Sequence, residues 1–286
     1  MERTDNKFEE IYNDLDFLVW AAEVEHNPGA LFLLGCKYYY GDGVDQDTKI
    51  AVNYVKQAAE LGEPQSAELL AIAYRDGEGV EQSYTSAVHW FLIAANKGLP
   101  ESMFALSRSY LFGRGVKADP EQSIQWLIKA AKNGHAVAEC KLGEAYYYGD
   151  GVPEDKEKAV YWCKLSAKQG NAEAMFCLGL SYLQGDGVAK NRRNALNYLR
   201  KSAHQDYTPA QLELFHALHK QNMGEATQWL LRGAELGNSE CQYGCGLLYE
   251  GGFGVNKDIQ KAFSWYKKSA AQGFERAIER LEQMGY

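Results

Sequence analysis

The sequence predicts an all-α protein: an α/α solenoid, wound as a right-handed superhelix of seven helix-turn-helix repeats with a helical cap at each end. The first observation is a tyrosine that recurs every 36 residues, at Tyr38, Tyr74, Tyr110, Tyr146 and Tyr182. The second is a Gly-x-Gly-Val segment that starts three residues after the tyrosine of a repeat, at residues 41–44, 77–80, 113–116, 149–152, 185–188 and 252–255. Because each repeat packs only on its neighbours, the 286 residues need no single large core.

The first helix of each repeat is predicted from its apolar spacing. In the fourth repeat, Ala138, Leu142 and Tyr146 stand four residues apart, which places them on one stripe of a helix. The Gly-x-Gly segment then reverses the chain, because glycine reaches a positive φ without a clash of a Cβ atom. A helix, a turn and a second helix therefore make up one repeat.

The second helix follows a residue that favours the N-cap position, such as Asp47, Ser83 or Asp119. It carries an aromatic residue 16 positions after the tyrosine, and two small residues follow four and five positions later. We expect the aromatic residue and the small pair to pack against the first helix. Replacing one of these aromatic residues, Trp90, by alanine is then expected to cost about 3–5 kcal/mol of stability. The aromatic residues are Tyr54, Trp90, Trp126, Trp162 and Tyr198, with Trp229 and Trp265 in the last two repeats.

The same spacing sets the predicted boundaries. Residues 1–29 form an N-terminal helical cap and residues 277–286 a C-terminal capping helix. The sixth repeat is degenerate: it lacks five residues and the glycine turn, so residues 220–223 must connect its helices. This change is either drift in a tolerant loop or a local change of curvature that shapes a binding site. The seven repeats span 30–65, 66–101, 102–137, 138–173, 174–209, 210–240 and 241–276.

Composition narrows the class of protein. The formal net charge of −8 argues against a nucleic-acid binder, which needs a basic face to contact phosphates. No stretch approaches the roughly 20 apolar residues that span a bilayer, so we expect no membrane partner. The first sixteen residues lack the basic and apolar regions of a signal peptide. We therefore expect a cytoplasmic protein.

The whole repeat resembles the Sel1-like repeat, a relative of the tetratricopeptide repeat, over roughly residues 17–286. The resemblance implies the paired-helix solenoid described above. It also implies a role in protein complexes, because Sel1-like proteins are adaptors and scaffolds. Many bacterial members act in host interaction or signalling, and some are immunity proteins that stand beside toxins. The fourth repeat carries the pattern most fully, in Ala138, Leu142, Gly143, Tyr146, Gly149, Gly151, Val152, Asp155, Ala159, Trp162, Ala167 and Gly170.

The cysteines depart from one branch of this family. Its secreted, cysteine-rich members form a disulfide in each repeat and place a cysteine at the second position of the small pair. Here that position is alanine in every repeat. The six cysteines show no regular pairing, which indicates free thiols in a reducing compartment. They are Cys36, Cys140, Cys163, Cys177, Cys241 and Cys245.

A second stripe of the first helices predicts the binding surface. Positions two, five and six after the leucine face away from the leucine–tyrosine stripe, and in related superhelices this side lines the concave groove. Aromatic, aliphatic and a few charged residues gather there, which is typical of an interface. Some of them could instead pack between neighbouring first helices as plain core. The predicted partner-binding residues are Tyr39, Tyr40, Arg75, Arg108, Phe112, Glu144, Tyr147, Tyr148, Leu183 and His219.

Patterns that would indicate catalysis or a metal are weak. His216 and His219 lie three apart on a helix but have no identifiable third ligand. Cys241 and Cys245 fall on core positions of the seventh repeat. The S-x-x-K pattern of Ser264 to Lys267 lies within a second helix, outside the context of a hydrolase. The Gly-x-Gly segments follow helices rather than strands, so we expect no phosphate loop, no cofactor and no catalytic or metal-binding residue.

The sequence therefore favours a scaffold that holds a peptide or loop of another protein in its groove. A narrower alternative is an immunity protein, an antitoxin that neutralises a bacterial toxin. An alternative from another class is a hydrolase or metal-binding protein built on Ser264 or on His216 and His219.

Overall fold

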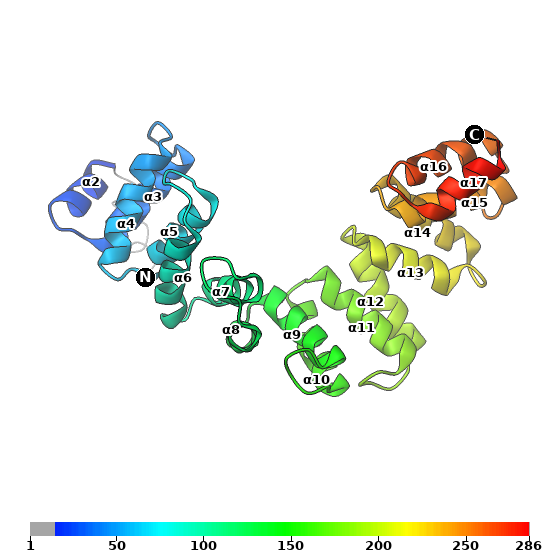
Figure 1. The fold of residues 1–286 in the computed structure, drawn as a ribbon, viewed down its shortest axis with the longest axis horizontal. Coiled ribbons are helices and arrows are strands. Elements are labelled where there is room, and N and C mark those ends of the chain that lie inside the picture. The colour runs from blue at the N-terminus through cyan, green and yellow to red at the C-terminus, as the bar shows by residue number, and fades with distance from the viewer. Residues whose placement is uncertain (1–14, 286) are drawn as a thin grey trace, which may run out of the picture. The chain divides into compact units, whose positions relative to one another are not determined.

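The computed structural model describes residues 15–285 and contains sixteen α-helices and no strand in that range (Figure 1). None of these helices is both long enough and apolar enough to cross a bilayer. The chain divides into two compact units, residues 1–142 and 143–286, which are described separately. The predicted all-α repeat architecture is confirmed. Residues 1–14 of the predicted N-terminal cap, and Tyr286 of the C-terminal one, lie outside the described residues.

The first unit contains the cap helix and three complete helical hairpins. Each helix packs on the helix before it and the helix after it in the chain, from α2 to α8, as a solenoid requires. The division between the units falls within α9. The helices are α2 (Leu15–Glu23), α3 (Pro28–Tyr40), α4 (Thr48–Glu60), α5 (Pro64–Asp76), α6 (Tyr84–Asn96), α7 (Pro100–Phe112), α8 (Pro120–Lys132) and α9 (Ala136–Tyr148).

The second unit repeats this order. Its helices also pack on their sequential neighbours, from α10 to α17. They are α10 (Lys156–Lys168), α11 (Ala172–Gln184), α12 (Arg192–His204), α13 (Thr208–Leu218), α14 (Met223–Glu235), α15 (Ser239–Gly251), α16 (Ile259–Ala270) and α17 (Glu275–Gln283).

The predicted turn chemistry explains where the helices end and begin. Helix α7 ends at Gly113, which has φ +67° and donates its N–H to the carbonyl of Ser109. This left-handed residue satisfies a helix carbonyl that would otherwise lack a partner. Helix α8 begins after Asp119, whose carboxylate accepts a 3.0 Å hydrogen bond from the Gln122 N–H. Asn191 caps α12 in the same way.

The second glycine of the turn has a further role that the spacing alone does not reveal. A Cβ atom at Gly79, Gly115 or Gly187 would collide with the carbonyl oxygen of the first residue of the preceding second helix. At Gly115 that residue is Tyr84, in α6. Glycine is therefore needed here for its positive φ and also for close packing between successive repeats.

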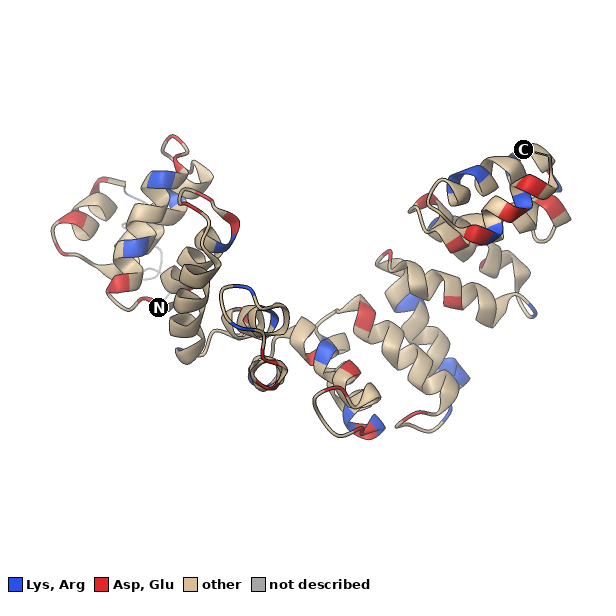
Figure 2. Ribbon diagram, in the orientation of Figure 1, with Lys and Arg blue, Asp and Glu red and all other residues tan. Residues whose placement is uncertain are grey.

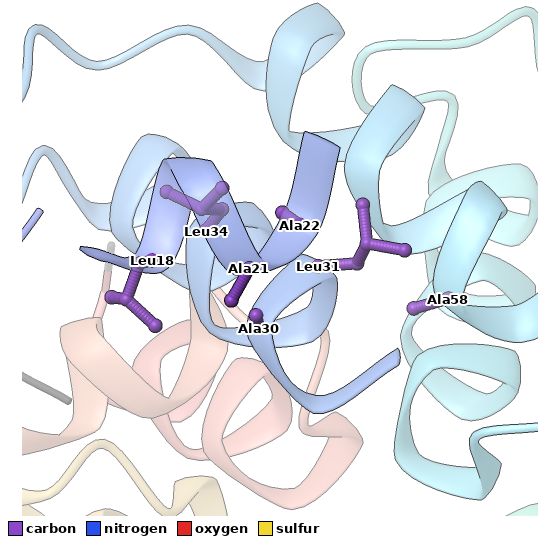
Figure 3. Close-up of a cluster of buried hydrophobic side chains, with 7 residues drawn as sticks. All are labelled: Leu18, Ala21, Ala22, Ala30, Leu31, Leu34 and Ala58. Carbon is purple, nitrogen blue, oxygen red and sulfur yellow. The ribbon is translucent and has the colours of Figure 1, made fainter. Parts of the chain in front are cut away.

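The core is built from the predicted leucine stripe and the small pairs. Leu34, Leu70, Leu106, Leu178 and Leu214 are fully buried. The alanines of the small pairs are buried beside them, including Ala94 and Ala130. At the N-terminal cap, Leu18 and Ala22 of α2 pack with Leu31 and Leu34 of α3 (Figure 3). The partly buried Phe17 packs against this cluster.

The periodic aromatic residue of the second helix is less buried than expected. In α6 Trp90 is only half-buried, whereas the next residue, Phe91, is 2% exposed. The same holds for Tyr198 and Leu199 in α12. The reason is the close approach of the helices: a Cβ at Gly179 in α11 would strike the Leu199 side chain, so the residue after the aromatic one lies between the helices. The exceptions are Trp126 and Trp229, which are buried.

The sixth repeat is shortened as the sequence indicates. Helix α13 has 11 residues instead of 13 and ends at Leu218. Its C-cap, His219, has a right-handed conformation, where the first helices of the other repeats have a left-handed glycine. Residues 220–222 connect it to α14, whose N-cap Asn222 accepts a 3.2 Å hydrogen bond from the Glu225 N–H. Met223, expected in the connection, is instead the first residue of α14.

Candidate partner-binding surface

The ten predicted partner-binding residues lie on first helices or just after them, and they differ in exposure. Tyr40, Arg75, Arg108, Phe112 and Tyr148 are exposed, and the other five are half-buried. Tyr40 and Tyr148 are the most open, at 73% and 76% exposed. Each forms an edge-to-face pair with the preceding tyrosine, at centroid distances of 5.0 Å for Tyr39–Tyr40 and 4.9 Å for Tyr147–Tyr148. Such pairs hold large apolar area at the surface in a fixed geometry.

Two of the half-buried residues connect neighbouring repeats. The Tyr39 hydroxyl donates to the carboxylate of Glu78, and the Tyr147 hydroxyl donates to Asp186 at 2.8 Å. In both cases the acceptor is the middle residue of the Gly-x-Gly turn of the next repeat. Lys156 also binds Asp186, at 2.9 Å. We call the hydrogen bond from the tyrosine hydroxyl of one repeat to the acid in the turn of the next repeat the tyrosine–acid link.

The tyrosine–acid links explain the direction in which the pKa values of the linked side chains are shifted. The hydrogen bond to Glu78 raises the pKa of Tyr39, and the hydrogen bond to Asp186 raises that of Tyr147. Hydrogen bonds from Lys156 and then from Tyr147 lower the pKa of Asp186. The two tyrosines therefore remain protonated donors at neutral pH. Their hydroxyl groups are engaged within the protein, so only their rings are left for a partner.

Where the link is replaced in the first unit, a cavity opens. The positions that correspond to the tyrosine and the acid are Arg75 and Arg114, which cannot bond to each other. A cavity of about 430 Å³ lies between α5, α6 and α7, and both arginines line it. Arg108 and Phe112, also predicted from the sequence, line the same cavity. Its remaining walls include Tyr84, Phe91, Glu101 and Phe104.

A second cavity opens in the second unit, again where the link is replaced. The corresponding residues there are His219 and Phe253, and both line a cavity of about 630 Å³. Phe215, Met223 and Leu247 also line it. The walls are mainly apolar, and Phe253 is 61% exposed. This cavity adjoins the shortened sixth repeat, because His219 and Met223 lie at the two ends of its connection.

Sequence reasoning missed Arg114 and Phe253. Both are the middle residue of a Gly-x-Gly turn, a position that is acidic in the other turns, at Asp42, Glu78, Asp150 and Asp186. The signal was present in the sequence as the two departures from an otherwise acidic position. It was overlooked because the turn was considered only for its glycines. In Figure 2, basic and acidic residues are interspersed within each unit.

The other predicted residues have more local roles. Leu183 packs against the buried cluster around Leu199 and Leu214. Glu144 is half-buried, and its charge contributes to the raised pKa of the Cys163 thiol, for which the hydrogen bond to Cys177 is the largest cause. All six cysteines are free thiols.

The residues that could indicate a metal site or catalysis make contacts within the fold. The Nδ1 atom of His219 lies 2.9 Å from the His216 carbonyl oxygen, and both rings contact Phe215. Burial raises the pKa of the Cys241 thiol to about 12, so it is protonated at neutral pH. The Lys267 ammonium lies 4.5 Å from the centre of the Phe263 ring.

Comparison with known proteins agrees with the repeat seen in the structure. The Sel1 repeat model matches residues 28–63, 64–99, 100–135, 136–171, 172–207, 214–238 and 239–274. Among solved structures, a protective antigen present in uropathogenic Escherichia coli strains, which displays an SLR fold, is 33% identical with a TM-score of 0.84. That match covers 94% of this chain and 59% of the antigen. A Sel1 repeat protein from Oxalobacter formigenes is 28% identical with a TM-score of 0.77, covering 99% of this chain and 82% of that one.

Two curated fungal proteins share a shorter segment. Chitin synthase regulatory factor 3 of Schizosaccharomyces pombe is 36% identical over 86 residues, which are 28% of this chain. A chitin synthase regulator of Saccharomyces cerevisiae is 37% identical over 62 residues, which are 22% of this chain. The matched segment is 9% of each of these relatives, so the similarity concerns the repeats and not the whole regulators.

Proposed function

Since this chain belongs to the Sel1 repeat family, we propose that it is a scaffold that binds a peptide or loop of a partner protein on the inner side of its first helices. It acts by shape and apolar burial rather than by catalysis. The six free thiols fit a reducing compartment, and we extend the proposal to a cytoplasmic protein.

One observation carries this proposal: two cavities lie where other residue pairs, Arg75 with Arg114 and His219 with Phe253, take the place of the tyrosine–acid link. Both cavities are lined by first helices, and each is bordered by an exposed aromatic residue, Phe112 at 58% and Phe253 at 61%. Aromatic and arginine side chains in such hollows are the usual energetic centres of protein interfaces. An inserted side chain of a partner would bury these rings without requiring the helices to move.

The relatives are compatible with this role. Two of them are named as regulators of chitin synthase, and the part they share with this chain is a run of repeats. A protein-binding function of the repeats would suit a regulator of an enzyme. An immunity function would use the same surface and would make the partner a toxin, so the identity of the captured protein decides between the two.

Affinity capture with matched variants tests the proposal. The tagged chain is incubated with lysate of its own source cells, and bound proteins are quantified by mass spectrometry. Phe112→Ala and Phe253→Ala should each lower the recovery of a direct partner that contacts its cavity by about 10-fold or more, because loss of an interface hot spot costs 2 kcal/mol or more. The control is Tyr161→Ala, since Tyr161 is 56% exposed but lies on the second helix α10.

The control defines the opposite result. If every protein captured by the wild-type chain is recovered equally well by Phe112→Ala and Phe253→Ala, the inner side of the first helices is not the binding surface. If Tyr161→Ala alone lowers recovery, the partner binds the second helices instead.

A further inference from the structure

The cavity between α5, α6 and α7 holds more positive charge than its own carboxylates neutralise. Arg75, Arg108 and Arg114 line it together with two acidic residues. Asp76 is already paired with Arg75, through bonds of 2.9 and 2.7 Å. Among residues 15–285, the Arg108 guanidinium has no hydrogen bond or ion pair.

The second carboxylate of the cavity, Glu101, is also occupied. It lies 2.9 Å from Nε2 of His135. Nδ1 of the same ring accepts a 3.0 Å hydrogen bond from the Ala138 N–H, which leaves Nε2 to face Glu101. Glu101 is therefore hydrogen-bonded to His135, and the charges of Arg75 and Arg108 also act on it. The three arginines of the cavity still outnumber its two carboxylates.

Arg114 occupies a position that carries a carboxylate in neighbouring repeats. In the first link the carboxylate belongs to Glu78, and in the second unit to Asp186. In this turn the acid is replaced by Arg114, whose guanidinium carbon lies 5.6 Å from the centre of the Phe112 ring. The site therefore lacks the internal carboxylate of the other repeats and offers two arginines beside aromatic rings.

We propose that this cavity binds an aspartate or glutamate side chain from an internal, extended segment of the partner protein. The carboxylate lies between Arg108 and Arg114, and an adjacent apolar side chain packs on Phe104 and Phe112. Guanidinium groups recognise carboxylates through paired, charge-assisted hydrogen bonds, and the aromatic rings hold the arginine planes in place. This inference rests on the proposed function and adds the chemistry of the segment that is bound.

The net charge of the chain does not oppose an acidic segment here. The overall charge is −8, but residues 64–135, which contain the cavity, carry seven Lys and Arg and seven Asp and Glu. Charges farther away than a Debye length, about 8 Å at physiological salt, are largely screened. The charges lining the cavity therefore decide which group enters it.

A peptide-display experiment tests this inference. A library of random 12-residue peptides fused internally to a coat protein is selected on the wild-type chain. Phage that also bind the Arg108→Gln, Arg114→Gln double variant are removed. The fold of this variant is checked by circular dichroism. Enriched peptides should contain Asp or Glu next to an aliphatic or aromatic residue. Replacing that acid by its amide should weaken binding by about 10- to 100-fold, measured by fluorescence polarisation.

A matched arginine provides the control. Arg193 is exposed at the start of α12, far from this cavity in the sequence, and Arg193→Gln should leave the affinity of the selected peptides unchanged. Arg108→Gln should lower it about 10-fold, and raising the salt concentration should weaken the acidic peptides more than their amide forms. Enrichment of neutral or basic peptides, or equal binding of acid and amide forms, would overturn the inference.

Two further outcomes separate this inference from the proposed function. A second library that displays free C-termini identifies terminal carboxylates, and enrichment from that library alone would replace the internal acid by a C-terminal one. If a captured partner is lost with Phe112→Ala but retained by Arg108→Gln, the scaffold function stands and the acidic occupant is wrong. If no peptide or protein depends on Phe112, Phe253 or Arg108, both proposals fail.

Discussion

The second glycine of the Gly-x-Gly turn allows two successive repeats to pack closely, because it has a hydrogen atom where other residues have a Cβ. Gly115 and Gly43 have nearly the same backbone, with φ +76° and +75°. At Gly115 a Cβ would meet the carbonyl of Tyr84, whereas at Gly43 it would meet nothing within 4 Å among residues 15–285. The two positions therefore separate the conformational role of glycine from its packing role.

We predict that Gly115→Ala destabilises the protein clearly more than Gly43→Ala. Both substitutions place a Cβ in the left-handed region, at a cost of about 1–2 kcal/mol. Only Gly115→Ala also forces α6 away from the turn, which adds about 1–3 kcal/mol. Urea unfolding followed by circular dichroism measures the difference. If the two variants lose the same free energy of unfolding, the close contact with Tyr84 does not contribute to stability.

Individual residues also show how far a binding site can be predicted from the sequence. Arg75, Arg108 and Phe112 were predicted from their helical phase and do line one cavity. Tyr39 and Tyr147 were predicted with the same argument, yet their hydroxyl groups bind Glu78 and Asp186. Helical phase indicates the direction in which a side chain points. It does not tell whether a residue 39 positions later meets that side chain.

At the scale of one helix, two adjacent residues compete for the deepest position. They are 100° apart around the helix axis, so periodicity alone allows either of them to face the core. In α6 the 36-residue repeat singles out Trp90, but the structure buries Phe91 and leaves Trp90 half-buried. The helix pattern, caps and turns were predictable because they depend on local chemistry. The exact rotation of the second helix depends on the side chains of its partner helix.

The rotation of α6 that buries Phe91 predicts a larger loss of stability for Phe91→Ala than for Trp90→Ala. Removing the buried Phe91 ring enlarges the cavity between α5, α6 and α7 and should cost about 3–5 kcal/mol. Trp90→Ala removes a half-buried ring and should cost less, about 1–2 kcal/mol by its smaller loss of buried apolar area. Thermal and urea unfolding of the two variants gives the order. The reverse order would mean that the sequence-based assignment of Trp90 to the core is correct.

At the scale of the whole chain, the repeats and their family could be predicted because 36-residue periodicity is a property of the sequence itself. The cavities could not, because each depends on a pair of residues in successive repeats. Arg75 with Arg114, and His219 with Phe253, matter as pairs that replace the tyrosine–acid link. The shortened sixth repeat was visible in the sequence. Only the structure shows that this repeat borders the second cavity, through His219 and Met223.

Because helices α2 to α8 in the first unit and α10 to α17 in the second each pack on their sequential neighbours, damage should stay local. Leu214 is fully buried in α13, and Leu214→Ala should cost about 2–5 kcal/mol there. We predict that this change speeds amide hydrogen exchange about 10-fold or more in α12 to α14, while α3 to α6 keep their wild-type rates. Hydrogen-exchange mass spectrometry measures both regions in one experiment. Leu70→Ala in α5 is the matched control and should give the opposite pattern. Equal acceleration in both regions would mean that the chain opens as one cooperative body.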